Sequence, residues 1–370
     1  MALTLGEYLG GLAKEQRNQR ETQGMESGTI TSRFILSTHR VKFLTSRVLI
    51  ESRNIGSYFI LGSASNGVLG TNTLSTNMVW GNAGTKWGSA IWGGTQQSFS
   101  TVEEITMSQP LTDTGKNLIA QWLGGTSITS PSHFGLGTDS TIFTESDTSL
   151  GTEIARSAID TLDNSIDATI TYTGTILSTQ SAFQSDTFRE LGIFNASSSG
   201  TMFGRYIISS LNMINTKDYK FTVDINILDN TVGFALIPTT GLNLLRDILT
   251  GNSVTAPTHV AWGAGAFYDS VNNSGLWDNA IWDSNANPLA TDTTILDEIQ
   301  RNIIGNTTVT NNIVSYDTIL TSSQANGEDL TKLGIFNASS GGDLFLKLKY
   351  GKIDKTNIFQ IQSINRVLIL

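Results

Sequence analysis

The sequence predicts a mainly β protein, in which two tandem antiparallel β-sandwich-like domains, each with one short helix, follow an N-terminal β-rich region. Three observations lead to this fold class. A ten-residue block recurs almost unchanged late in the chain, several segments alternate apolar with polar residues, and only 15% of residues are charged. Alternation with a period of two is typical of half-buried strands. Low charge is typical of surfaces that pack against other subunits.

The internal repeat defines the expected domains. Leu191–Gly200 reads LGIFNASSSG and Leu333–Gly342 reads LGIFNASSGG, nine matches in ten positions at an offset of 333 − 191 = 142. Three further blocks recur in the same order: T-G-x-N-L-[I/L] from Thr114 and Thr240, P-x-H from Pro131 and Pro257, and D-x-x-[L/I]-x-x-E-I-x-R from Asp147 and Asp292. These blocks predict a region at 1–110 and two copies of one domain at 111–235 and 236–370, each long enough to bury its own core.

Each copy is expected to open with a short helix. Apolar residues at positions i, i+1, i+4 and i+5 would form one buried stripe on such a helix. These residues are Leu118, Ile119, Trp122 and Leu123 in the first copy, and Leu244, Leu245, Ile248 and Leu249 in the second. Gly124 and Gly251 follow, and glycine is favoured at helix C-termini.

Alternating segments predict the strands that follow. Ile166 to Ile176 and Tyr219 to Ile227 alternate apolar with polar residues, and Ile313 to Leu320 holds the place of the first segment in the second copy. The LGIF segment and a strand at Met202–Ser209 flank Asn195–Gly200, which is predicted to be a hairpin turn. The strands expected in the N-terminal region are Ile30–Leu36, Arg40–Ile50 and Ser57–Leu61.

Composition excludes several classes of function. The formal net charge of −9 argues against a nucleic-acid partner, because such surfaces depend on clustered Lys and Arg. No segment approaches the roughly 20 apolar residues that cross a bilayer, so membrane insertion is not expected. Cysteine is absent, and no GxGxxG, P-loop, GxSxG or HExxH motif occurs. The sequence therefore predicts no enzyme, no cofactor and no metal.

One segment partly matches a calcium-binding loop, but a turn is the favoured interpretation. Asp283-Ser-Asn-Ala-Asn287 resembles the first ligands of such a loop. Pro288 and Thr294 stand where the loop needs glycine and glutamate, so a turn is favoured.

Charged and amide residues recur at matched positions and are expected to be structural. Glu153 and Arg156, like Glu298 and Arg301, lie three residues apart, so each acid is expected to form an ion pair with its arginine. Removing the acid from a partly buried pair would cost about 3–5 kcal/mol. Asn195 and Asn337 fit the N-x-S glycosylation pattern, but the hairpin turn explains both. His133 and His259 are likewise expected to pack or to hydrogen-bond within the fold.

Two groups of residues are candidates for contacts with partners. Five tryptophans lie among Gly, Asn and Asp, where exposed aromatics could bind glycans or subunits; the alternative is that they pack under loops. They are Trp80, Trp87, Trp92, Trp277 and Trp282. A second group, Leu5, Tyr8, Leu9 and Leu12, forms an apolar stripe too short for a stable isolated helix. It is expected to dock on a partner, or alternatively on the first β domain of its own chain.

The ordered blocks resemble a module in tail-associated structural proteins of tailed bacteriophages and related tailed viruses. Leu150–Arg156 and Glu190–Arg205 carry the closer match, while the second copy has Lys332 and Lys347 in place of Glu190 and Arg205. The W-x-x-A-I-W segments at Trp87 and Trp277 are also similar to pieces of phage structural proteins. The resemblance covers about 260 of 370 residues and touches 1–110 only loosely.

The resemblance implies a virion protein without catalytic residues. The favoured role is a tail, baseplate or fibre-attachment component that assembles as a homo-oligomer with other tail proteins in the host cytoplasm. The alternatives are a receptor-binding adsorption protein, whose Trp-rich loops hold host surface glycans, and a head decoration protein. A glycan-degrading enzyme would need clustered acids, and the sequence offers no obvious pair.

Overall fold

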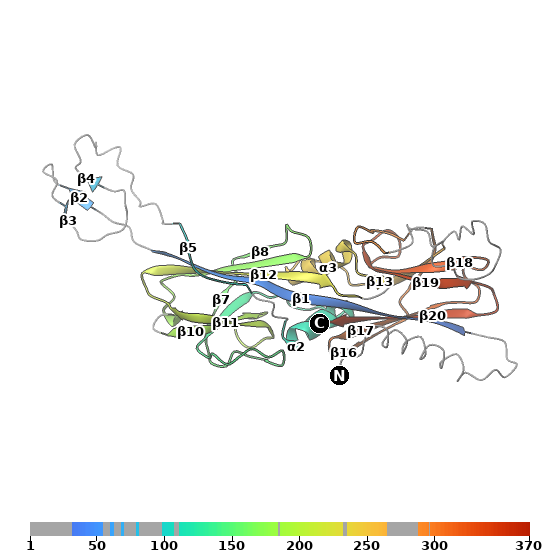
Figure 1. Cartoon of the computed structure of the whole chain (residues 1–370), viewed down its shortest axis with the longest axis horizontal. Coiled ribbons are helices and arrows are strands. Elements are labelled where there is room, and N and C mark those ends of the chain that lie inside the picture. The colour runs from blue at the N-terminus through green and yellow to red at the C-terminus, as the bar shows by residue number, and fades with distance from the viewer. Residues whose placement is uncertain are drawn as a thin grey trace.

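The computed structural model describes residues 32–54, 60–62, 68–69, 79–80, 98–106, 111–183, 186–231, 235–264, 288–295 and 297–370. These residues confirm the predicted fold class, because they are mainly β and include two α-helices, α2 (Asp113–Leu123) and α3 (Thr239–Leu249). Two β-sandwiches lie end to end in an elongated molecule, the first in green and the second in red in Figure 1.

The strands are numbered in chain order. The N-terminal ones are β1 (Ser32–Asn54), β2 (Ile60–Gly62), β3 (Val68–Leu69), β4 (Val79–Trp80) and β5 (Ser100–Ile105). The first sandwich adds β6 (His133–Gly137), β7 (Glu153–Ala158), β8 (Thr161–Asp163), β9 (Thr169–Ile176), β10 (Thr187–Phe194), β11 (Met202–Asn212) and β12 (Lys217–Asp229). The second adds β13 (Ala235–Leu236), β14 (His259–Ala264), β15 (Glu298–Ile303), β16 (Asn306–Thr310), β17 (Ile313–Leu320), β18 (Asp329–Phe336), β19 (Leu344–Asp354) and β20 (Gln360–Ile369).

The two sandwiches share one strand order. The small sheet of the first runs β11-β10-β6-β7 and that of the second runs β19-β18-β14-β15, with β13 added beside β19. The large sheet runs β16-β17-β20-β1-β12-β9-β8 through both sandwiches. Leu191–Phe203 and Leu333–Phe345 are both strand–turn–strand units at matching places, as expected. The boundaries at 110 and 235 stay a prediction.

The core lies between the small and large sheets. In the first sandwich the rings of Phe134 in β6 and Phe221 in β12 are 6.4 Å apart at their centroids. In the second, Trp262 in β14 and Tyr316 in β17 are fully buried. Close packing of such large side chains supplies most of the apolar burial that stabilises each sandwich.

β1 belongs to both sandwiches. Its 23 residues pair in parallel with β20 from Ser32 to Val41, and antiparallel with β12 from Val41 to Asn54. Val41 is the partner of both Asp229 and Ile369, so the ends of β12 and β20 meet beside it. In Figure 1 this blue strand runs along both halves.

The continuity of β1 corrects a sequence prediction. Two strands were expected, Ile30–Leu36 and Arg40–Ile50, because Ser37 and His39 interrupt the apolar alternation. In the structure both polar side chains point inward and are buried, so the alternation continues from Ile35 to Thr45. An irregularity in the pairing between Thr45 and Arg47 then shifts it by one residue. The third expected strand, Ser57–Leu61, overlaps only the start of β2.

His39 sits in a buried polar chain. The Ser37 hydroxyl donates to Oδ1 of Asn365 at 2.7 Å and lies 3.0 Å from Nε2 of His39. Because the hydroxyl proton is committed to Asn365, Ser37 accepts from Nε2–H and leaves Nδ1 as the unprotonated nitrogen. Burial disfavours the charged ring and lowers the pKa of His39 to about 3.

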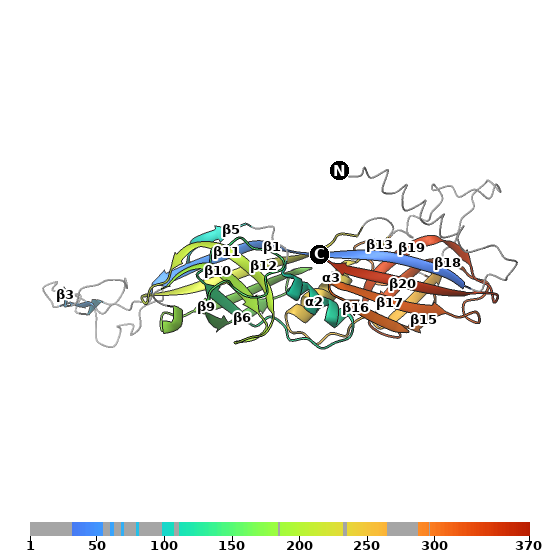
Figure 2. The same cartoon turned by 90° about the horizontal axis from the view of Figure 1, so that it is seen from below.

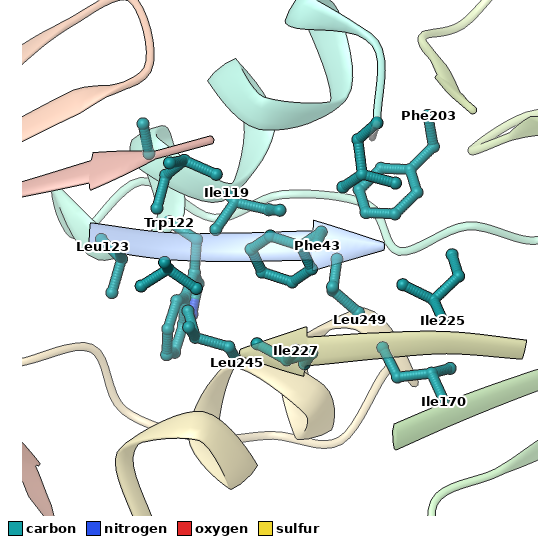
Figure 3. Close-up of a cluster of buried hydrophobic side chains, with 14 of the residues drawn as sticks. Phe43, Ile119, Trp122, Leu123, Ile170, Phe203, Ile225, Ile227, Leu245 and Leu249 are labelled. Atoms are coloured by element: carbon teal, nitrogen blue, oxygen red, sulfur yellow. The ribbon is translucent and has the colours of Figure 1, made fainter. Parts of the chain in front are cut away.

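The two helices form the joint between the sandwiches (Figure 2). Most of their expected stripes are buried there, Ile119, Trp122 and Leu123 on α2 and Leu244, Leu245 and Leu249 on α3, with Phe43 of β1 among them (Figure 3). Leu118 and Ile248, also expected in the stripes, are half-buried. Gly124 caps α2 as expected, whereas α3 is capped by Thr250 and Gly251 follows in the left-handed region.

Each helix closes the end of the other sandwich. The Tyr316 hydroxyl in the second sandwich donates to the Leu123 carbonyl at the end of α2, at 3.0 Å. The Tyr172 hydroxyl in the first sandwich donates to the Leu249 carbonyl at the end of α3, at 3.2 Å. Asn243 of α3 also accepts from the Ala168 amide at 2.8 Å. The helices are therefore exchanged between the two halves.

The recurring Thr-Gly pair explains how each helix sits on its own sandwich. Thr114 and Thr240 donate their hydroxyls to the carbonyls of Met202 and Leu344, each at 2.8 Å. A Cβ on Gly115 would lie 2.5 Å from the Phe203 carbonyl oxygen, and one on Gly241 would lie 2.1 Å from that of Phe345. Only glycine allows the helix to approach the strand this closely.

We expect Gly115→Ala and Gly241→Ala each to lower the free energy of unfolding by about 1–3 kcal/mol, because the new Cβ meets strand backbone. This cost exceeds the roughly 1 kcal/mol that alanine gains over glycine in a helix. Gly305→Ala is the control, since its nearest atom would be 3.5 Å away. Urea denaturation measures all three, and equal values for joint and control positions would contradict the packing described.

Acid should destabilise the protein through His39. The unfolded chain protonates this ring near pH 6.5, its ordinary pKa, whereas the folded chain does so only near pH 3. The unfolded state therefore binds more protons between these values, and stability falls as the pH drops below 6.5. At about pH 4.5 the loss amounts to roughly 2–3 kcal/mol.

His39→Gln removes this contribution. The difference in unfolding free energy between pH 7 and pH 4.5, measured by urea denaturation, should be roughly 2–3 kcal/mol smaller in the variant than in the wild type. An unchanged difference would show that His39 does not carry the acid sensitivity.

Candidate functional site

A surface turn recurs in both sandwiches. Asn195–Thr201 joins β10 to β11, and Asn337–Asp343 joins β18 to β19. The Asn195 side-chain oxygen accepts from the Thr201 amide at 2.7 Å, and that of Asn337 accepts from the Asp343 amide at 2.7 Å. The asparagine of each N-A-S block therefore closes the turn. We call the two segments the paired turns.

Arg156 holds the first of the paired turns. Its Nε and Nη2 donate to the two carboxylate oxygens of Glu153 at 2.6 and 2.9 Å. Its Nη1 donates to the carbonyls of Ala196 and Ser199 at 2.9 and 2.5 Å. The guanidinium also lies over the Phe194 ring, 3.5 Å from the centroid. One arginine thus joins β7, β10 and the turn.

Arg301 repeats the arrangement in the second sandwich. It donates to both oxygens of Glu298 at 2.7 and 2.6 Å, and to the carbonyls of Ala338 and Gly341 at 3.0 and 2.8 Å. It lies 3.8 Å from the centroid of the Phe336 ring. Both expected Glu–Arg pairs are present, and each also fastens a turn that the sequence did not connect to it.

The arrangement is suited to presenting a rigid surface. Each glutamate is bonded to its arginine through both oxygens, so neither offers a free carboxylate for proton transfer. Ser197 and Ser198 at the tip of the first turn are exposed, as are Ser339 and Ser340 at the second. The paired turns thus carry the same hydroxyl-rich tip on two different sandwiches.

A buried charged cluster distinguishes the first sandwich. Glu190 is fully buried and accepts from the amides of Gly151 and Thr152, each at 3.0 Å, and from Arg205 Nε at 2.8 Å. Arg205 also donates to Asp147 at 2.9 Å. Burial raises the pKa of Asp147, but hydrogen bonds from Thr144 and Arg205 outweigh it and lower the pKa overall.

The second sandwich carries different charges at these positions. Lys332 replaces Glu190 and is buried, and Lys347 replaces Arg205 and donates to Asp292 at 2.6 Å. The sequence marked both positions only as departures from the repeat. The change of sign from Glu190 to Lys332, beside a cation kept at Arg205 and Lys347, was the available signal that these positions lie in a charged, buried place.

The two matched histidines have local partners. Nδ1 of His133 lies 2.8 Å from the Ser132 hydroxyl, and Nδ1 of His259 lies 2.8 Å from the Thr258 hydroxyl. Desolvation, and then the positive charge of Arg156 or Arg301, lowers the pKa of each ring. Across the described ranges no group of three or more His, Asp and Glu residues is placed to hold a metal ion.

A shallow groove of about 590 Å³ lies between β15 and β17. Its apolar lining includes Ile303 and Ile319, which are 69% and 43% exposed. Two of its amide side chains are already engaged, because Asn302 and Gln324 donate to each other at 2.9 and 3.0 Å. Amide groups that are bonded to each other are not available to bind a polar ligand, so this pair indicates no specific substrate.

The candidate partner-contact residues lie elsewhere. Leu5, Tyr8, Leu9, Leu12, Trp87, Trp92, Trp277 and Trp282 are outside the described residues, as is Asp283–Asn287. Trp80 belongs to β4, for which only the backbone is described. Whether the tryptophans bind glycans or subunits, or pack under loops, stays a hypothesis.

Comparisons with known proteins return no match, whether to a protein-family model, a curated protein or a solved structure. Within the described parts of the chain, neither helix is long and apolar enough to cross a membrane.

We expect Arg156→Met to lower the free energy of unfolding by about 2–4 kcal/mol, because it leaves two carbonyls and a carboxylate without their donor. Glu153→Gln should cost only about 1 kcal/mol, since the glutamate side chain is 29% exposed. This loss of stability is smaller than the roughly 3–5 kcal/mol expected for a buried ion pair. Thermal and urea denaturation of both variants measure the difference.

Arg189→Met, at an exposed position of β10, is the control and should leave stability unchanged. Arg301→Met should lower the free energy of unfolding by the same amount as Arg156→Met. If Arg156→Met behaved like Arg189→Met, the arginine would not hold the turn.

Proposed function

We propose that this chain is a structural component of a tailed-virus particle, most favourably a tail, baseplate or fibre-attachment protein that assembles as a homo-oligomer. The observation that carries the proposal is the resemblance of its ordered blocks to a module of tail-associated virion proteins. Residues in those blocks build the framework of the fold. Thr-Gly seats the helices in the joint, and E-I-x-R together with LGIFNASS builds the paired turns.

Composition supports a protein that is covered by neighbours. With 15% charged residues and a Ser, Thr, Asn and Gly-rich surface, contacts with other subunits desolvate few charges. An elongated chain of two sandwiches also offers a long side for packing within an assembly (Figure 1). Assembly into a larger particle uses both properties.

The assembly claim is tested by native mass spectrometry of the full chain. The expected result is one discrete homo-oligomer that persists as the protein is diluted through the micromolar range. A species of 39.9 kDa at every concentration would contradict homo-oligomeric assembly. Removing residues 1–24 tests the expected docking helix, and a truncated chain that assembles normally would exclude it.

The location claim is tested by immunogold labelling of particles purified from cultures that produce the chain. Label on the tail or baseplate is expected. Label on the head would favour a decoration protein, and unlabelled particles would contradict a virion role. A glycan array on the purified chain separates receptor binding, which requires Trp87, Trp92, Trp277 or Trp282 to be exposed, from a purely structural part.

A further inference from the structure

The inner face of the large sheet differs in polarity between the two sandwiches. Tyr172 and Tyr316 mark equivalent positions, because each donates its hydroxyl to the end of the other half's helix. Val223 of β12 lies beside Tyr172, and at the matching place Asn365 of β20 lies beside Tyr316. In the next inward row, the first sandwich pairs Gly174 with Phe221 and the second pairs Thr318 with Ser363. Apolar positions in the first sandwich are thus polar in the second.

The small sheets also differ in polarity, at some matched positions. Leu136 lies beside Leu191 in the first sandwich, and Trp262 lies beside Leu333 in the second. The next partners are Tyr206 in the first sandwich and Leu348 in the second, so at this position the polar residue belongs to the first sandwich. Two residues further along the same strands, β11 has Ile208 and β19 has Tyr350. Both faces of the second core therefore carry polar atoms.

These polar atoms lack partners among the described residues. Six of them lie in the second sandwich or in the part of β1 paired with it, all buried: His39 Nδ1, Trp262 Nε1, Thr318 Oγ1, Thr331 Oγ1, Tyr350 OH and Asn365 Nδ2. Two further buried oxygens lie in the first half, Asn117 Oδ1 on α2 and Glu51 Oε2 on β1, and Glu51 forms an ion pair with Lys220. Of the inward polar side chains in the first sandwich, Thr45 donates to the Tyr206 hydroxyl at 3.1 Å, so this pair is satisfied. A buried polar group without a partner destabilises the closed state that buries it.

We propose that the second sandwich is the half of the molecule that opens, with Val41 as the hinge. Opening lets the six unpartnered groups of this half bond to water, whereas among the described residues the first half has only the Asn117 and Glu51 oxygens to release. The N-terminal half of β1 separates from β20, while residues beyond Val41 stay paired with β12. The first sandwich then acts as the fixed anchor, and residues 32–40 with the second sandwich are the part that rearranges.

Hydrogen–deuterium exchange of the full chain, read by mass spectrometry, tests the proposal. Peptides from β17 and β20 should exchange at least tenfold faster than peptides from β9 and β12. The β1 peptide before Val41 should exchange faster than the peptide after it. Equal exchange in the two sandwiches, or faster exchange in the first, would overturn the proposal whether or not the chain proves to be a virion protein.

Two variants link the exchange to the polar groups. Thr318→Val removes an unpartnered hydroxyl with little change of shape, and should slow exchange in β17 and β20 at least threefold without affecting β9 and β12. Val223→Asn places the polar residue of the second core in the first, and should speed exchange there. Unchanged exchange in Thr318→Val would show that the hydroxyl is satisfied in the closed state and would overturn the mechanism. Should Val223→Asn not fold, the wild-type comparison and Thr318→Val still decide.

Discussion

The fold depends on one strand whose backbone must pair twice. Buried backbone groups need hydrogen-bond partners, and β1 meets this requirement with β20 along one half and β12 along the other. Its inward side chains fill both cores, with Ile35 in the second sandwich and Val48 and Ile50 in the first. Without it, the large sheet would divide into β16-β17-β20 in the second sandwich and β12-β9-β8 in the first. The C-terminal ends of β12 and β20 point toward each other beside Val41. β1 runs past both in one direction, so it is antiparallel to β12 and parallel to β20. The two sandwiches therefore face opposite ways along the molecule.

The exchanged helices follow from that arrangement. Where β12 and β20 meet beside Val41, each sandwich has an open end, and the helix of the opposite half covers it with an apolar stripe (Figure 3). The Thr-Gly pair at the start of each helix and the tyrosine hydroxyl at its end fix its position at both ends. The recurring blocks are therefore the parts of the chain that join the two halves or hold the paired turns. Positions that have diverged, such as Glu190 against Lys332 and Val223 against Asn365, lie inside a single sandwich.

Local patterns in the sequence were sufficient for the helices, for the strands β9 to β12, β17 and β18, and for the turn after each LGIF segment. Each of those features is set by residues a few positions apart, such as the apolar stripe of Ile119 and Trp122. β1 was divided in two because Ser37 and His39 are polar yet buried, and their partner Asn365 lies more than three hundred positions away. The Glu–Arg pairs were predictable from spacing, but the carbonyls that Arg156 holds are 40 and 43 residues along the chain. Sequence spacing carries no information about such contacts.

The shared strand can be tested directly because the chain has no cysteine. Thr38 lies beside Arg366 in the parallel pairing, and Leu49 lies beside Thr222 in the antiparallel one. Facing Cα atoms in neighbouring strands are close enough for a disulfide, whereas a shift of two residues takes them out of range. A chain with cysteines at all four positions, oxidised and mapped by mass spectrometry, should form both cross-links in one molecule. A separate control variant with cysteines at Leu36 and Leu368, which do not face each other, should form none. Failure of either cross-link, or equal formation of the control one, would contradict a β1 that belongs to both sandwiches.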